Sequence, residues 1–141
     1  MSLEDNKAVV HAFAEVISSH DLARLDTVIG EQYLQHRPDV ASGREPVRRY
    51  FAELIAAFPD LIRTDEDIAA EGDKVWVRTS YRGTHLGSYR GIPPTGRQIR
   101  YRTVDIFRVA NGRLVEHWDV VDQTDMLTTI GALVTPDSSA T

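Results

Sequence analysis

The feature that most constrains the fold is the dipeptide Asn111-Gly112, which separates two long runs of alternating apolar and polar residues. Asn-Gly favours a two-residue turn in which both residues take a positive φ, so it predicts a β-hairpin. The flanking runs, 99–109 and 114–121, are each long enough to cross a domain as a strand. We therefore expect two long antiparallel strands near the C-terminus, with the rest of the fold built around them.

The second of these strands carries an unusual set of polar side chains, Glu116-His117-Trp118-Asp119-Val120-Val121-Asp122. Side chains alternate between the two faces of a strand, so His117 and Asp119 point one way and Glu116 and Trp118 the other. Whichever face turns inward, a carboxylate goes with it. A buried carboxylate is costly unless it is paired, hydrogen-bonded or used in proton transfer, so a functional site is expected here.

Helical periodicity marks the N-terminal part of the chain and strand alternation the C-terminal part. Apolar residues recur at helical spacing over 9–17, 22–29 and 47–58, and a short extended segment, 33–36, ends before Pro38. Further strands are expected over 61–70 and 74–84, and a short helix over 124–130. This order predicts an α+β fold in which a bent sheet closes round helices and leaves one open mouth. We expect a single domain over 1–135 and a frayed tail over 136–141.

Composition excludes several classes of protein. The chain has no cysteine, so it has no disulfide framework, thiolate zinc site or cysteine nucleophile. A net charge of -5 argues against a nucleic-acid partner. No apolar run approaches the ~20 residues that cross a bilayer, and there is no signal-peptide pattern, so we expect a cytoplasmic protein without a membrane partner. Histidine spacing and the absence of a phosphate loop predict neither a metal nor a cofactor.

Several motifs, in one order along nearly the whole chain, resemble the SnoaL-like polyketide cyclase family of the nuclear-transport-factor-2-like superfamily. They are Asn6-Lys7-Ala8-Val9-Val10, Tyr33-Leu34-Gln35-His36, Ala57-Phe58-Pro59-Asp60-Leu61, Ala70-Glu71-Gly72-Asp73-Lys74-Val75, Gly83-Thr84-His85, Gly91-Ile92-Pro93-Pro94-Thr95-Gly96-Arg97 and Gly112-Arg113-Leu114-Val115-Glu116-His117-Trp118. The resemblance implies a cone-shaped α+β barrel, in which a curved mixed sheet wraps round three N-terminal helices. It also implies a cofactor-free pocket and a homodimer formed through the outer face of the sheet.

Cyclases of this family close a ring by intramolecular aldol condensation of a polyketide, with an aspartate as general acid/base. The resemblance places that role on Asp119. The positions that supply a glutamine and a histidine in the best-known cyclases match Thr103 and Asp105 here, and an early asparagine matches Gln35. The polar lining therefore differs from theirs, and their substrates do not transfer with the fold.

We predict three catalytic residues. Burial would raise the pKa of Asp119 toward neutrality and suit it to proton transfer. His36 is a candidate acid/base or oxyanion donor, and Asp105 interrupts an apolar strand on what looks like its inward face. The structural alternatives are that Asp119 pairs with an arginine, that Asp105 neutralises a buried base and that His36 only makes hydrogen bonds. Substrate contacts are expected from Trp118, Tyr33, Gln35, Phe51, Tyr101, Thr103 and His117.

The register of the hairpin decides whether the two aspartates can cooperate. A strict two-residue turn at Asn111-Gly112 pairs Asp105 with Trp118 and turns Asp119 to the opposite face. Asp105 and Asp119 share a pocket only if a β-bulge shifts the parity between them.

The sequence thus favours a cofactor-independent cyclase or isomerase acting on a small hydrophobic, polyketide-like carbonyl compound. A hydrolase of the epoxide-hydrolase type is an alternative on the same fold, with Asp105 and Asp119 activating water beside Arg102 or Arg78. A non-catalytic module for ligand binding or dimerisation is another. That alternative predicts acids that are salt-bridged at the pocket rim and no carboxyl with a raised pKa.

Overall fold

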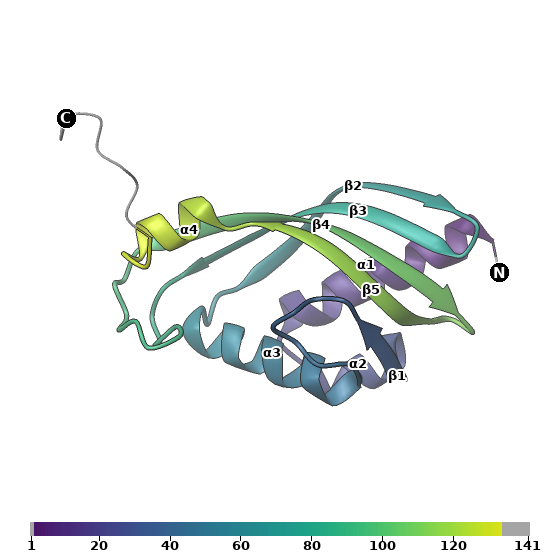
Figure 1. Ribbon diagram of the computed structural model, residues 1–141, viewed down its shortest axis with the longest axis horizontal. Helices are drawn as coiled ribbons and strands as arrows, with labels where there is room; N and C mark the ends of the chain where they lie inside the picture. The colour runs from purple at the N-terminus through teal and green to yellow at the C-terminus, as the bar shows by residue number, and fades with distance from the viewer. Residues whose placement is uncertain (1, 134–141) are drawn as a thin grey trace.

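The computed structural model describes residues 2–133 and has the expected α+β architecture (Figure 1). Three helical segments come first: α1 (Leu3–Ser19), a 3-10 turn η1 (Leu22–Arg24) that leads into α2 (Leu25–Val28), and α3 (Arg44–Ala57). Strand β1 (Ile29–Gln35) lies between α2 and α3, and begins at Ile29, which the periodicity had assigned to the second helix. The predicted tail over 136–141 lies outside the described residues.

Four long strands follow: β2 (Ile62–Glu71), β3 (Lys74–Thr84), β4 (Gln98–Ala110) and β5 (Arg113–Asp122), with α4 (Thr124–Thr129) after them. The sheet order is β1-β5-β4-β3-β2, and β1 runs parallel to β5 while the other neighbours are antiparallel. The mixed, curved sheet and N-terminal helices confirm the predicted fold class. Among the described helices, none is long and apolar enough to cross a membrane.

Local sequence explains where the elements begin and turn. The Ser2 side chain accepts a hydrogen bond from the backbone N–H of Asp5, and the Asp5 carboxylate accepts one from the backbone N–H of Ser2, so α1 starts in a capping box. Asn111 and Gly112 both have positive φ, 52° and 74°, and Ala110 pairs with Arg113 across them. The hairpin predicted from Asn-Gly is therefore present, with the two-residue turn that these residues favour.

Helices α1, α2 and α3 lie along one side of the sheet, which curves over them (Figure 1). Buried apolar side chains of these helices and of the sheet form the core. On β4, alternate residues face this core, and all of them are buried: Ile99, Tyr101, Thr103, Asp105, Phe107 and Val109. The opposite face of the sheet is exposed and carries Trp76, Val104 and Val120. Thr103 and Asp105 thus interrupt an otherwise apolar inner row of β4, and the site forms around them.

Candidate active site

A β-bulge in β5 brings the two predicted aspartates to one face. Val109 pairs with Leu114, but the next residue of β4 toward the N-terminus, Arg108, pairs with Glu116, so Val115 is left over. Beyond this extra residue the parity of β5 is reversed, and Asp119 becomes the direct cross-strand partner of Asp105. Both carboxyl groups therefore point to the helical side of the sheet, together with His117.

These residues line a cavity between the sheet, α1, α3 and the segment after β1. Its lining consists of Phe13, Tyr33, Gln35, Arg37, Val40, Val47, Tyr50, Phe51, Arg63, Tyr81, Tyr101, Thr103, Asp105, Phe107, His117 and Asp119. Eight of the ten site residues predicted from the sequence are among them. The wall is largely aromatic, as a pocket for a hydrophobic substrate requires.

Asp105 is fully engaged by its neighbours. Its Oδ2 accepts hydrogen bonds from Arg63 Nη1 at 3.1 Å and from Thr103 Oγ1 at 2.7 Å, and its Oδ1 lies 2.8 Å from His117 Nε2. Burial by itself raises the pKa of this carboxyl, but the Arg63 charge and the His117 and Thr103 hydrogen bonds outweigh burial and lower the pKa to about 2. Asp105 is thus a permanent carboxylate that neutralises a buried base.

Asp119 has a different environment on the same face. Its side chain is only 8% exposed, and its closest charged partner is Arg37, whose Nη1 lies 3.5 Å from Oδ2. Among the residues that the structure describes, none makes a hydrogen bond to this carboxyl group. Burial raises its pKa above the ordinary value, although the charges of His117 and Arg37 oppose the shift. Asp119 is therefore a cavity carboxyl that is protonated more easily than an exposed aspartate.

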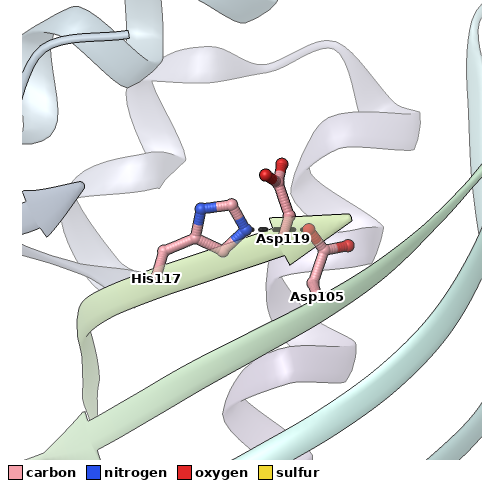
Figure 2. Close-up of side chains that lie close together, drawn as sticks. All are labelled: Asp105, His117 and Asp119. Atoms are coloured by element: carbon pink, nitrogen blue, oxygen red, sulfur yellow. Dashed lines mark hydrogen bonds and ion pairs between the residues drawn. The ribbon is translucent and has the colours of Figure 1, made fainter. Parts of the chain in front are cut away.

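His117 lies beside the two aspartates, and its ring points toward Asp105, to which a dashed line joins it (Figure 2). Nε2 contacts Asp105, and Nδ1 lies 2.7 Å from Gln35 Oε1, which also accepts a hydrogen bond from the backbone N–H of Arg37 at 3.3 Å. Because both ring nitrogens face acceptor oxygens in this arrangement, both can act as donors only in the imidazolium form. The ring packs on Tyr33 and Phe107, so its orientation is held by stacking as well.

Two arginines of the site were not predicted. Arg63 on β2 is 1% exposed, lies against the rings of Phe13 and Tyr81 and donates to the Tyr81 hydroxyl at 2.7 Å. Arg37 follows β1. Alternation did contain the signal, because Arg37 continues the row of Tyr33 and Gln35, both of which were expected to face the pocket.

His36 and Trp118 lie outside the cavity, contrary to the predicted placement. His36 Nε2 is 2.8 Å from Glu116 Oε2, and its ring stacks on Trp118 at a centroid distance of 4.7 Å. The bulge at Val115 explains Trp118: it turns the indole to the face opposite Asp105, where it lies near Lys74. His36 lies between Gln35 and Arg37, which both line the cavity, so its own side chain points away from the cavity.

Asp105, His117 and Asp119 also have donor atoms that all lie within 4.8 Å of one another, a spacing at which three side chains can share a cation. Two of the three already have partners, since Asp105 is bound by Arg63 and His117 by Asp105 and Gln35. A cation here would have to replace those contacts.

Comparison with known proteins agrees with this architecture. Residues 7–130 match the family described as SnoaL-like polyketide cyclase. The chain belongs to the SnoaL-like polyketide cyclase family. The same assignment follows from the motifs of the sequence, and it accounts for the cavity on the helical side of a curved sheet.

Individual members of the family are similar to this SnoaL-like chain at modest identity. Aklanonic acid methyl ester cyclase DauD of Streptomyces sp. (strain C5) is 30% identical over 91 residues, which are 63% of this chain and 55% of DauD. The matched part thus spans little more than half of that relative. Among solved structures, IdmH of Streptomyces antibioticus, a proposed polyketide cyclase, has 32% identity and a TM-score of 0.77, covering 89% of this chain and 98% of IdmH.

AclR of Streptomyces galilaeus, a proposed hydroxylase, has a TM-score of 0.88 at 26% identity. The match covers 99% of this chain and 93% of the AclR chain. The SnoaL-like fold therefore accompanies more than one proposed reaction among similar proteins. The reaction of this SnoaL-like protein has to be argued from its own residues.

Proposed function

We propose that this protein is a cofactor-independent cyclase or isomerase that acts on a small hydrophobic, polyketide-like carbonyl compound, with Asp119 as general acid/base. The observation that carries the proposal is the Asp119 carboxyl, which lies in an aromatic cavity with a raised pKa. A base for carbon acids needs this combination, because a carboxylate freed from strong hydrogen bonds accepts a proton more readily.

In the proposed reaction, Asp119 takes a proton from the carbon between two carbonyl groups of the substrate. The electrons of the broken C–H bond form a C=C bond, and the carbonyl π electrons move to oxygen, which gives an enolate. In a cyclase, the enolate carbon then attacks a second carbonyl of the same molecule, and a C–C bond forms. The new alkoxide takes the proton back from Asp119, so the enzyme returns to its starting state.

Asp105 and His117 have supporting roles in this proposal. Asp105 is ionised throughout and bound to Arg63, so it is a poor proton acceptor. It holds the His117 ring through Nε2, and Gln35 holds the same ring through Nδ1, so His117 is a positioning residue whose two ring nitrogens are already engaged. His36 has no role in the proposed chemistry, because its contacts are Glu116 and Trp118.

Aklanonic acid methyl ester, the compound in the name of the relative DauD, is a suitable first probe. We expect turnover by the purified protein and a loss of about 10²–10⁴-fold in kcat for Asp119→Asn. Asp122→Asn, the same change at an exposed position of β5, is the matched control. If the substrate is converted and Asp119→Asn retains full turnover, Asp119 is not the proton carrier.

One observation favours a hydrolase as second candidate. Asp105 and Asp119 converge within 4.8 Å of His117 and are flanked by Arg63 and Arg37, which resembles the acid-base pairs that activate water. Arg78 and Arg102, which the sequence suggested for this role, do not line the cavity. Incubation with styrene oxide in ¹⁸O-labelled water tests this candidate, since a hydrolase incorporates one labelled oxygen into the diol.

We also propose that the protein forms a homodimer through the outer face of the sheet. Val120 on β5 is 72% exposed, Trp76 on β3 is 50% exposed and Val104 on β4 is 37% exposed. Apolar side chains on three adjacent strands form a surface that association would remove from water. The raised pKa of Asp119 inside the cavity argues against a module whose only function is such an interface.

A further inference from the structure

Proton abstraction by Asp119 moves a negative charge within the cavity. Before the step the charge is on the Asp119 carboxylate, and after it the charge is on the substrate oxygen while Asp119 is neutral. An enolate formed in a largely apolar cavity needs donors at its oxygen, or the step is strongly uphill. A suitable donor has to be close to both Asp119 and the adjoining space, so that the charge stays paired throughout.

Arg37 has this position. Its Nε and Nη2 bind the two oxygens of Asp39 at 2.7 and 3.2 Å, which fixes the guanidinium plane. Nη1 is thereby turned to the cavity, where it lies 3.0 Å from the Tyr50 hydroxyl and 3.5 Å from Asp119 Oδ2. Nη1 carries two hydrogens, so it can donate to Tyr50 and still serve an anion beside Asp119.

Tyr50 supplies a second donor at the same place. Its hydroxyl oxygen accepts the hydrogen bond from Arg37, so its single O–H hydrogen has to point elsewhere. Tyr50 lines the cavity, and no described residue accepts that hydrogen. Burial raises the pKa of Tyr50, although the nearby Arg37 charge opposes the shift, so the hydroxyl keeps its proton at neutral pH.

Arg63 is not equivalent, although it is also a cationic part of the wall. Its Nη1 is used by Tyr81 and Asp105, and its Nε and Nη2 are buried without a hydrogen-bond partner among the described residues. The group lies against the Phe13 and Tyr81 rings. Arg63 thus holds Asp105 in place, and Arg37 is the cation beside the carboxyl that takes the proton.

We infer that Arg37 Nη1 and the Tyr50 hydroxyl form an oxyanion-binding site for the enolate oxygen of the substrate, an assignment that rests on the proposed role of Asp119 as base. The site selects substrates whose carbonyl oxygen lies next to the acidic carbon, so that the oxygen reaches Arg37 while the C–H bond faces Asp119. Enolisable β-dicarbonyl compounds meet this requirement.

The test uses an anion in place of the enolate and does not depend on turnover. The Asp119→Asn protein mimics the state in which Asp119 has taken up the proton. Binding of 4-nitrophenol to this protein is followed by absorbance across pH, which gives separate affinities for the phenol and the phenolate. We expect the phenolate to bind about tenfold more tightly than the phenol, because a fixed guanidinium pairs with it.

In the same background, Arg37→Met should remove most of this preference, and Tyr50→Phe should weaken phenolate binding by about fivefold through one lost hydrogen bond. Arg100→Met, which removes an equal charge from the exposed face of β4, is the control and should change neither affinity. Arg37→Lys keeps the charge with a smaller donor set and provides a folded comparison if Arg37→Met is unstable.

Equal phenol and phenolate affinities in the Asp119→Asn protein would overturn the inference. So would a phenolate preference that survives Arg37→Met in the folded protein, or that Arg100→Met reduces as much as Arg37→Met does. The failure of the proposed function has a separate signature, namely full turnover of substrate by Asp119→Asn. The two results are therefore distinguishable.

Discussion

Asp105 and Asp119 are direct cross-strand partners on β4 and β5, yet burial has opposite outcomes for the two carboxyl groups. Asp105 receives donors from Arg63, Thr103 and His117, and its pKa is lowered to about 2. Asp119 has Arg37 at 3.5 Å and no hydrogen bond from any described residue, and burial raises its pKa. Hydrogen bonds therefore keep Asp105 ionised, whereas Asp119, which lacks them among the described residues, is suited to carry a proton.

The raised pKa of Asp119 predicts a pH-dependent gain in stability for Asp119→Asn. The folded state holds this proton more tightly than the unfolded state, so wild-type stability falls as pH rises from the unfolded value through the folded pKa. Asparagine removes that loss. We expect the variant to unfold at a higher temperature than wild type above this range, with the difference vanishing below pH 3.8. A variant that is less stable at neutral pH would contradict the prediction.

The pKa shift of Asp105 has the opposite sign to that of Asp119, so it affects stability at the acid end of the pH range. Its folded pKa of about 2 lies below the unfolded value of 3.8, so its contribution of about 2 kcal/mol is present above pH 3.8 and is lost as pH falls through about 2. Acid unfolding monitored by circular dichroism should show this loss in wild type.

Replacing Asp105 also leaves Arg63 buried without its nearest hydrogen-bonded counterion. We expect Asp105→Asn to lower the free energy of unfolding by about 3–5 kcal/mol, measured by urea denaturation at pH 7. Asp122→Asn, which breaks the exposed pair with Arg102, should cost under about 1 kcal/mol. Similar losses for the two variants would mean that burial of the Asp105 pair has no special weight.

The outer face of the sheet gives a prediction about assembly. Val120→Glu places a charge on the apolar surface of that face without touching the core, because Val120 is 72% exposed. We expect wild type to elute as a dimer in size-exclusion chromatography with light scattering, and Val120→Glu to shift the equilibrium to monomer. The substitution Glu31→Gln on β1 is a control at another exposed position. A monomeric wild type would contradict the proposed dimer.

Gly87 gives a prediction about the loop after β3. A Cβ at this position would overlap the backbone oxygen of Ala56 at the end of α3, and the Gly87 N–H donates to the Ala57 carbonyl at 3.0 Å. Neither partner is a flexible side chain, so the backbone has to move. We expect Gly87→Ala to cost about 1–3 kcal/mol in thermal unfolding. Unchanged stability would show that α3 and this loop separate easily.

The sequence was sufficient for the fold because its signals are local. Asn111-Gly112 predicts a hairpin from its own φ preferences, and Ser2 with Asp5 caps α1 through contacts three residues apart. The alternation of Tyr101, Thr103 and Asp105 likewise determines the inner face of β4 without knowledge of the neighbouring strands. Each of these features depends on residues that are only a few positions apart, so it can be predicted from the sequence alone.

Only the tertiary structure decided how the site is assembled, because its contacts join residues that are far apart in sequence. The bulge at Val115 is a property of the pairing between two strands, and it determines that Asp119, and not Trp118, faces Asp105. Arg63 reaches Asp105 across 42 residues, and His36 meets Glu116 across 80. The sequence by itself thus determined the elements and the candidate acids. Packing determined their partners, and through those partners which carboxyl stays ionised and which can carry a proton.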